Sequence, residues 1–225
     1  MRMILAVLVM ALATCGLAVA QGSAWSVPDD CPPFCDRIPD SAWIVPTAIP
    51  LYPAYRWPGL AGLAVTAPAP RLRFEETCAS PPIADDPRSY AVAARAVVGN
   101  PEGHWQLQAQ VMHWRGEAWR GGETALATFE AAVDALRGCQ LTAPLNSPSI
   151  TTRHADRMAA VISGFGPARE VLHEYLLVDP RSSTVTELTM WASSPPLVDW
   201  PSVPDAEVLD AMAAPLCTAY IGSCR

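Results

Sequence analysis

Residues 105–114, WQLQAQVMHW, form the clearest strand pattern in the chain and decide the class of fold. Apolar and amide side chains alternate along this segment. The apolar set is Trp105, Leu107, Ala109 and Val111, and the amide set is Gln106, Gln108 and Gln110. Because successive side chains of a strand point to opposite faces, the pattern predicts one face in the core. The other face is then exposed to water or lines a groove.

The segments on either side extend this strand into a sheet with helices. Further strands are expected over residues 90–98, 150–163, 169–179 and 184–192, and helices over residues 123–137 and 205–220. Consecutive strands joined by short turns favour antiparallel pairing, and amphipathic helices can cover one face of such a sheet. Gly138 is suited to the left-handed position that often ends a helix. The sequence therefore predicts an α+β fold, an antiparallel β-sheet with two flanking helices.

Residues 1–20 have the three parts of a cleavable secretory signal peptide. Arg2 supplies the positive charge, residues 4–12 are an almost unbroken apolar run, and Ala18-Val19-Ala20 fits the cleavage motif. The mature chain is therefore expected to begin at Gln21. The apolar run is shorter than the ~20 residues of a membrane span. An uncleaved anchor and a lipid-modified Cys15 stay open as alternatives.

The mature chain divides by composition into residues 21–71 and residues 72–225. The first segment is rich in Pro, Trp and Tyr. Its proline density excludes helix and central strand and favours extended chain. We expect a Pro-rich arm whose aromatic residues dock on a folded surface, followed by the α+β domain over residues 72–225.

Six cysteines remain after the expected cleavage, an even number suited to three disulfides in an oxidising compartment. They are Cys31, Cys35, Cys78, Cys139, Cys217 and Cys224. Their connectivity stays open: the terminal pairs could each close locally, or the N-terminal pair could join the C-terminal helix. A bond between Cys78 and Cys139 would close a long loop and stabilise the fold by roughly 4 kcal/mol. The Cys-Pro-Pro-Phe-Cys spacing is not a zinc knuckle, so metal binding is disfavoured.

Charge and motif content exclude several classes of function. The formal net charge is −7, and all 15 basic residues are arginines without a basic run, a bias typical of a GC-rich genome. Nucleic-acid binding therefore has no electrostatic support. Dinucleotide, Walker A and zinc-protease motifs are absent, so no cofactor and no metal is expected. The pairs Glu75-Glu76 and Asp85-Asp86 lie in Pro-rich loops and are expected to be solvated acids.

The amide face of residues 105–114 is the best candidate for a ligand-binding site. Trp114 lies on the same face as Gln106, Gln108 and Gln110. Amide and indole donors together suit polar lipids or sugars. The alternative interpretation is that the tryptophans of this region only complete the core.

A catalytic alternative rests on His154 and Asp156. Two residues apart on a strand, these side chains would point the same way, and an acid can orient an imidazole for hydrolysis. No Gly-x-Ser-x-Gly nucleophile motif accompanies them. A secreted hydrolase with a dispersed catalytic site around His154 and Asp156 is therefore the second hypothesis, and a surface salt bridge is the simpler account.

Four features of the chain carry a resemblance to a known family. They are Cys78 before the first strand, Trp105 in the second, the helix ending in Gly138-Cys139, and the strands around Gly164-Phe165-Gly166. In layout and spacing, residues 73–220 resemble secreted or extracytoplasmic sensor-like domains of mycobacteria and their relatives. The best known is the extracellular sensor domain of a transmembrane Ser/Thr kinase. The resemblance implies an antiparallel sheet flanked by helices, disulfides and a ligand-binding cleft.

The sequence departs from that kinase because it has no kinase domain and no membrane helix that joins one to the sensor. Only a free-standing binding role therefore carries over. We expect an exported, non-enzymatic protein of an actinobacterial cell envelope that acts as a ligand-binding or accessory module. Its expected partner is an envelope small molecule, lipid or glycan, or another envelope protein.

Overall fold

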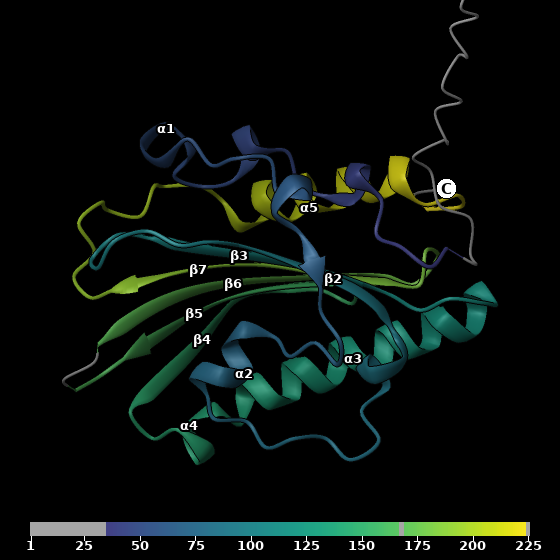
Figure 1. Cartoon of the computed structure of the whole chain (residues 1–225). Helices are drawn as coiled ribbons and strands as arrows, with labels where there is room; N and C mark the ends of the chain where they lie inside the picture. The colour runs from purple at the N-terminus through teal and green to yellow at the C-terminus, as the bar shows by residue number, and fades with distance from the viewer. Residues whose placement is uncertain (1–34, 167–168, 224–225) are drawn as a thin grey trace, which may run out of the picture.

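A seven-stranded antiparallel sheet forms the centre of the molecule (Figure 1). The computed structural model describes residues 35–166 and 169–223. The strands lie in the order β1-β2-β3-β7-β6-β5-β4. Their bounds are β1 (Val65–Thr66), β2 (Val92–Val98), β3 (Gln106–His113), β4 (Asn146–Arg153), β5 (Arg157–Gly164), β6 (Glu170–Asp179) and β7 (Thr184–Ser193). The α+β class and the antiparallel sheet predicted from the sequence are confirmed.

Two long helices and several short ones surround the sheet. The α-helices are α1 (Tyr52–Tyr55), α2 (Arg73–Thr77), α3 (Ala118–Arg137), α4 (Cys139–Thr142) and α5 (Asp205–Ala219). Short 3-10 helices cover Asp40–Ala42, Pro46–Ala48, Ala61–Leu63 and Pro87–Tyr90. Among the described residues, no helix has both the length and the hydropathy to cross a bilayer.

The two long helices pack on opposite faces of the sheet, with α5 above it and α3 below it in Figure 1. One core joins the apolar side chains of β3 to α5, and its members include Trp105, Leu107, Ala109, Val111, Val208, Leu209, Met212 and Leu216. The other joins α3 to the opposite face, and its members include Met112, Phe129, Val133, Leu136, Met158 and Leu172. The sequence had suggested that both helices cover one face. Both faces of this sheet carry apolar residues, so each needs its own cover.

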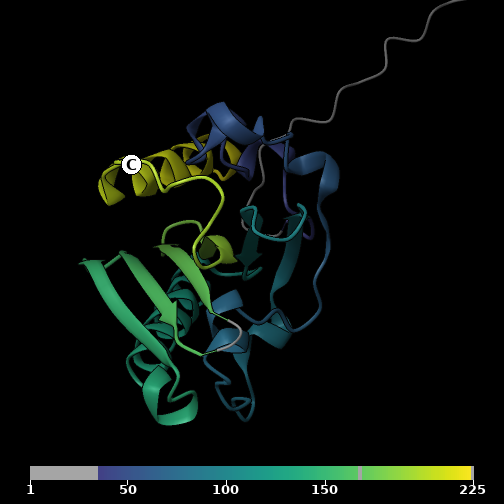
Figure 2. The ribbon, with the colours of Figure 1, turned by 90° about the vertical axis from the view of Figure 1, so that its left-hand side faces the viewer.

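The described part of the Pro-rich arm lies beside α5 on one face of the sheet (Figure 2). Trp43, Trp57 and Leu60 from the arm are buried in the same core as α5. The Trp57 indole donates to the carbonyl oxygen of Pro50 at 2.7 Å, and the Tyr55 ring stacks on Trp57. The arm is therefore part of the domain's core rather than a free spacer.

The chain between residues 146 and 164 forms two strands where the sequence suggested one. β4 and β5 pair with each other and are joined at residues 154–156. This connection contains neither Gly nor Pro, so the usual sequence signal of a tight turn is missing. The two-residue strand β1 is also too short to leave a periodic pattern. Both strands were therefore missed.

Helix α3 begins five residues before the predicted start because it includes Gly121 and Gly122. A side chain on Gly122 would collide with the carbonyl oxygen of Pro180, and one on Gly121 with the side chain of Ser183. The glycines thus let the helix approach the β6–β7 turn closely, as glycines can. Gly138 was expected in the left-handed region, but its φ is −78° and the short helix α4 follows directly.

Replacing Gly122 with alanine is expected to destabilise the protein by about 1–3 kcal/mol, although alanine favours helix by ~1 kcal/mol. The new methyl group must push the helix away from the Pro180 carbonyl group. Urea unfolding would measure the effect. Gly138→Ala is the matched control, since its methyl group would meet its nearest neighbours at 3.5 Å. Equal stability of the Gly122 variant and the control would contradict the close approach.

A disulfide between Cys78 and Cys139 ties the end of α2 to the start of α4. Both cysteines are fully buried. Cys35 and Cys217 also take part in disulfides. Cys31, Cys224, Cys15 and the expected signal peptide over residues 1–20 lie outside the described residues.

Candidate ligand-binding site

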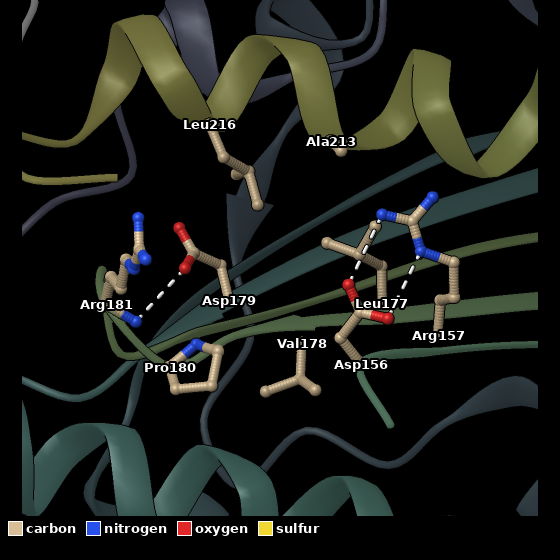
Figure 3. A pocket seen from close by; sticks show the side chains of 9 residues that line it. All are labelled: Asp156, Arg157, Leu177, Val178, Asp179, Pro180, Arg181, Ala213 and Leu216. Atoms are coloured by element: carbon tan, nitrogen blue, oxygen red, sulfur yellow. Dashed lines mark hydrogen bonds and ion pairs between the residues drawn. The ribbon is translucent and has the colours of Figure 1, made fainter. Parts of the chain in front are cut away.

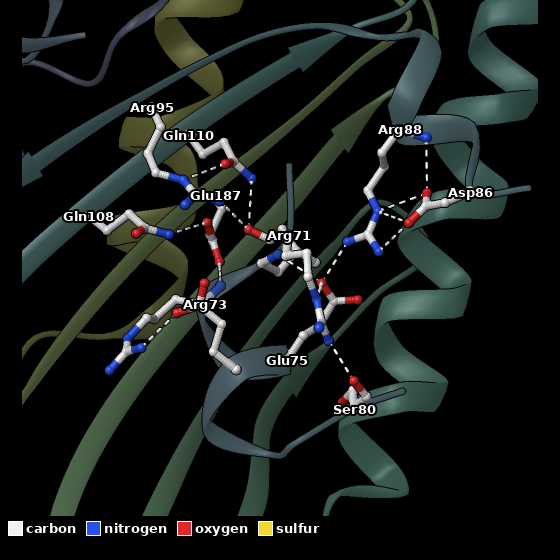
Figure 4. Close-up of polar contacts among 12 residues, drawn as sticks. Arg71, Arg73, Glu75, Ser80, Asp86, Arg88, Arg95, Gln108, Gln110 and Glu187 are labelled. Atoms are coloured by element: carbon white, nitrogen blue, oxygen red, sulfur yellow. Dashed lines mark hydrogen bonds and ion pairs between the residues drawn. The ribbon is translucent and has the colours of Figure 1, made fainter. Parts of the chain in front are cut away.

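The amide face of β3 is buried beneath the segment that contains α2 (Figure 4). Gln108 is 5% exposed and Gln110 is fully buried. The Gln108 Nε2 atom donates to Glu187 Oε2 at 3.1 Å, and Gln110 Oε1 accepts from Arg95 Nε at 2.8 Å. This face is therefore covered by the protein itself, whereas the alternation predicts a face that is exposed to water or lines a groove. The structure brings the two amides together, but the protein itself occupies their hydrogen-bonding groups.

Gln106 and Trp114 also make internal hydrogen bonds. Gln106 Oε1 accepts from the Asn100 backbone N–H at 2.6 Å, and its Nε2 atom donates to the Asn100 carbonyl oxygen at 2.8 Å. The Trp114 indole is buried and donates to the carbonyl oxygen of Pro87 at 2.9 Å. Ligand binding by these four residues stays a prediction, and the structure gives each of them a role within the fold.

One acid of each pair expected to be solvated, Glu75 and Asp86, takes part in a buried ion network, whereas Glu76 and Asp85 are exposed as predicted. Arg88 is 3% exposed and lies between Glu75 and Asp86, with N–O distances of 2.6 Å to each. Glu75 Oε2 also accepts from the Leu72 backbone N–H at 2.8 Å, at the start of α2. Partial burial tends to raise the pKa of Asp86, but hydrogen bonds from Arg88 outweigh it and leave that pKa below its usual value. A Pro-rich loop alone does not show which of its acids will be covered.

A second group of acids, Glu174 and Glu187, was not singled out by the sequence. Both are fully buried and lie on the neighbouring strands β6 and β7. Glu174 Oε2 accepts from Thr189 Oγ1 at 2.8 Å, and Glu187 Oε1 accepts from the Arg73 backbone N–H at 2.6 Å. Strand alternation was the available signal, because it puts Glu174 on the same face as the buried residues Leu172 and Leu176.

Burial strongly affects the ionisation of this acidic pair. It raises the pKa of Glu187 to about 7. The pKa of Glu174 lies well above its usual value, first because of burial and then because of the neighbouring Glu187 charge. Within residues 35–166 and 169–223, no group of three or more metal-binding side chains could hold an ion. The raised pKa values of Glu174 and Glu187 are suited to retaining a proton.

A pocket of about 390 Å³ lies at one end of the sheet, beneath α5 (Figure 3). Leu177 from β6 and the α5 residues Ala213 and Leu216 supply apolar wall, while Asp156, Arg157, Asp179 and Arg181 bring charges to it. The chain turns after Asp179, which brings Arg181 to the pocket from the β6–β7 connection. The volume falls within the ~300–1,000 Å³ typical of small-molecule sites.

Three of the four charged groups at this pocket are held by other protein groups. Arg157 binds Asp156 at 3.3 Å and Asp210 at 2.6 Å. Asp179 accepts from the Arg181 backbone N–H at 3.0 Å, from Ser182 Oγ at 2.8 Å and from Ser223 Oγ. The Arg181 side chain is exposed, and within the described chain no hydrogen bond or ion pair holds its guanidinium group. Arg181 is thus the charge best placed to meet a ligand.

The proposed catalytic pair His154 and Asp156 lies in the β4–β5 connection, not on a strand. The alternation that would align the two side chains therefore does not apply. His154 is exposed and its backbone N–H donates to the Arg157 carbonyl oxygen at 2.9 Å, while Asp156 pairs with Arg157. Among the hydrogen bonds of the described residues, none joins His154 to Asp156. The geometry does not assemble a His–Asp dyad.

No protein-family model matches the sequence, and no curated protein or solved structure shows significant similarity to it. The resemblance to sensor-like domains therefore stays a prediction.

Proposed function

We propose that this chain is an exported, non-enzymatic binding module of the cell envelope whose ligand occupies the pocket beneath α5. The observation that carries the proposal is the exposed Arg181 guanidinium group, which no described residue binds, beside apolar wall from Leu177 and Leu216. A ligand that matches this arrangement has an apolar body and one anionic group. The apolar part gains from leaving water, and a guanidinium group binds a carboxylate through strong, charge-assisted hydrogen bonds.

Export is supported by the disulfide chemistry of the chain. The buried Cys78–Cys139 bond ties together two elements of the domain, and such bonds persist mainly in oxidising compartments. The signal peptide expected at residues 1–20 would deliver the chain there. Small organic carboxylates of the envelope are thus the proposed class of ligand, in place of the polar lipids or sugars that an accessible amide face would favour.

Binding of simple carboxylates would test this site. Hexanoate and phenylacetate are expected to bind more tightly than hexanamide and phenylacetamide, which keep the apolar body and lack the charge. Arg181→Gln is expected to weaken carboxylate binding about tenfold, because a hydrogen bond to a charged group contributes roughly 1.5–3 kcal/mol. Ligand-detected NMR or calorimetry would give the affinities.

Two further variants sharpen the experiment. Ala213→Phe should fill the pocket and reduce binding of both carboxylates, because Ala213 forms part of its wall. Arg137→Gln is the control, since Arg137 is exposed on α3 and pairs with Asp134. Equal affinity for the acids and their amides, or carboxylate affinity unaffected by the Arg181 and Ala213 variants, would refute the proposed site.

A further inference from the structure

We propose that Glu174 and Glu187 form a proton-operated clasp for α2, a pair of acids whose protonation state decides whether the helix stays packed on the sheet. Helix α2 stays on the sheet while the pair retains a proton. It leaves the sheet when both carboxyl groups ionise. The proposal concerns a different part of the molecule from the pocket beneath α5 and does not depend on its ligand. It rests on how the two acids are paired, on what surrounds them and on which element can move.

The first step is that the closed structure requires a proton on the pair. The two side chains are fully buried, and within the described residues neither forms a salt bridge with an arginine. The neighbouring Glu187 carboxyl group raises the pKa of Glu174 further, beyond the effect of burial. Glu174 Oε1 is buried and has no hydrogen-bond partner among the described residues. Two adjacent negative charges without a counter-ion cannot remain buried.

The second step is that the surrounding charges do not compensate a second ionised acid. The charged groups around the pair are Arg71, Arg73 and Glu75 from α2 and the residues before it, Arg88 from the following loop, Arg95 from β2 and Glu170 from β6. Arg73 pairs with Glu76 at 2.8 Å and approaches Glu170 at 3.7 Å, and Arg88 is held by Glu75 and Asp86.

The remaining electrostatic effects on Glu187 oppose one another. Arg95 favours its ionised form from a distance, whereas the Glu75 charge disfavours it. The Arg95 guanidinium group itself binds Gln110 and the Arg71 carbonyl oxygen, not either acid of the pair. Water is then the remaining source of stabilisation for a second negative charge, and the cover over the pair must open to admit it.

The third step is that α2 is the element able to open. β6 and β7 each have a strand on both sides and cannot separate without breaking the sheet. In contrast, α2 has only five residues and follows a Pro-rich stretch over residues 67–70. The buried Phe74 side chain and the Glu75–Arg88 ion pair help to hold α2 on the sheet. Two contacts of Arg73 add to them: its backbone N–H binds Glu187, and its guanidinium group lies 4.5 Å from the Trp191 ring centre. The Cys78–Cys139 disulfide keeps its far end attached after release.

The direction of the pH effect follows from the raised pKa values. A carboxyl group whose pKa is higher in the closed state binds protons more tightly there, so protonation favours closure. The contribution of Glu187 to closure is complete in acid and is lost as the pH rises through about 7, where Glu187 ionises in the closed state. Above that pH the pair still holds the proton of Glu174, whose pKa is also raised by burial. Opening then releases this proton, so each further pH unit should increase the open population about tenfold until Glu174 ionises in the closed state as well.

Hydrogen exchange measured by mass spectrometry between pH 5.5 and 9 tests the clasp. Protection factors, corrected for intrinsic exchange rates, should fall at least tenfold for residues 71–77 across this range. Those for residues 171–178 in β6 should stay constant, which separates opening of α2 from global unfolding. In Glu174→Gln/Glu187→Gln, the protection of residues 71–77 should become independent of pH. The single variant Glu187→Gln provides the same comparison if the double variant does not fold.

Glu102→Gln is the matched control, because Glu102 is exposed in the β2–β3 connection and should leave the pH dependence unchanged. Constant protection of residues 71–77 in the wild type would overturn the proposal. So would a fall in protection that persists in the variants of Glu174 and Glu187.

Discussion

Replacing Arg88 with alanine is expected to reduce the free energy of unfolding by about 3–5 kcal/mol. Arg88 fills the space between Glu75 and Asp86 with 2.6 Å contacts to both. Its removal leaves the buried Glu75 carboxylate without its closest counter-ion, and an uncompensated charge inside a protein is strongly destabilising. Equilibrium unfolding in urea at pH 7 would measure the loss.

Arg137→Ala provides the control for this experiment. Arg137 also pairs with an acid, Asp134 at 3.0 Å, but both side chains are more than half exposed. Exposed pairs contribute about 0–1 kcal/mol because water and salt screen them. The Arg88 variant should therefore unfold at a much lower urea concentration than the Arg137 variant. Similar losses from the two variants would show that the buried network contributes no more than a surface pair.

Removal of the central disulfide through Cys78→Ala/Cys139→Ala is expected to lower the free energy of unfolding by about 4 kcal/mol. The two cysteines are separated by 61 positions in the sequence, so the bond restricts a large part of the unfolded chain. Both sulfur atoms are also fully buried, and alanine leaves their space partly empty. Urea unfolding under non-reducing conditions would measure the effect.

A reducing agent supplies the internal control for the disulfide. Once unfolded in dithiothreitol, wild type and the double variant both lack the bond, so their unfolding curves should approach one another. Without reductant the curves should be well separated. Coincident curves in the absence of reductant would contradict a stabilising role of this bond.

The strand faces could be predicted from the sequence because they depend on local alternation. Trp105, Leu107, Ala109 and Val111 do lie together in one core, as their spacing indicated. The start of α3 could not be predicted in the same way. Glycines such as Gly121 and Gly122 are normally unfavourable in a helix. Here they are needed because the helix packs closely against the turn after β6, which is distant in the sequence.

The candidate site was harder to predict than the sheet. Alternation correctly separated the glutamines of β3 from its apolar residues, but it carries no information on what covers a polar face. That cover is α2, and the acid that meets Gln108 is Glu187, 79 positions later. The pocket beneath α5 likewise combines β5, β6 and a distant helix. Such groupings depend on topology, which a single sequence specifies only indirectly.

The order in which the sheet can be covered follows from where its covering elements lie in the chain. Helix α3 directly follows β3, so one face can be covered by a nearby segment. The opposite face needs both the arm and α5, which come from the two ends of the described chain. Contacts between such distant segments form late in folding, because the entropy cost of closing the long loop must be met before the contacts stabilise the fold. During synthesis, this apolar face therefore remains open to self-association until α5 has emerged, which makes it the point where chaperones would protect the chain.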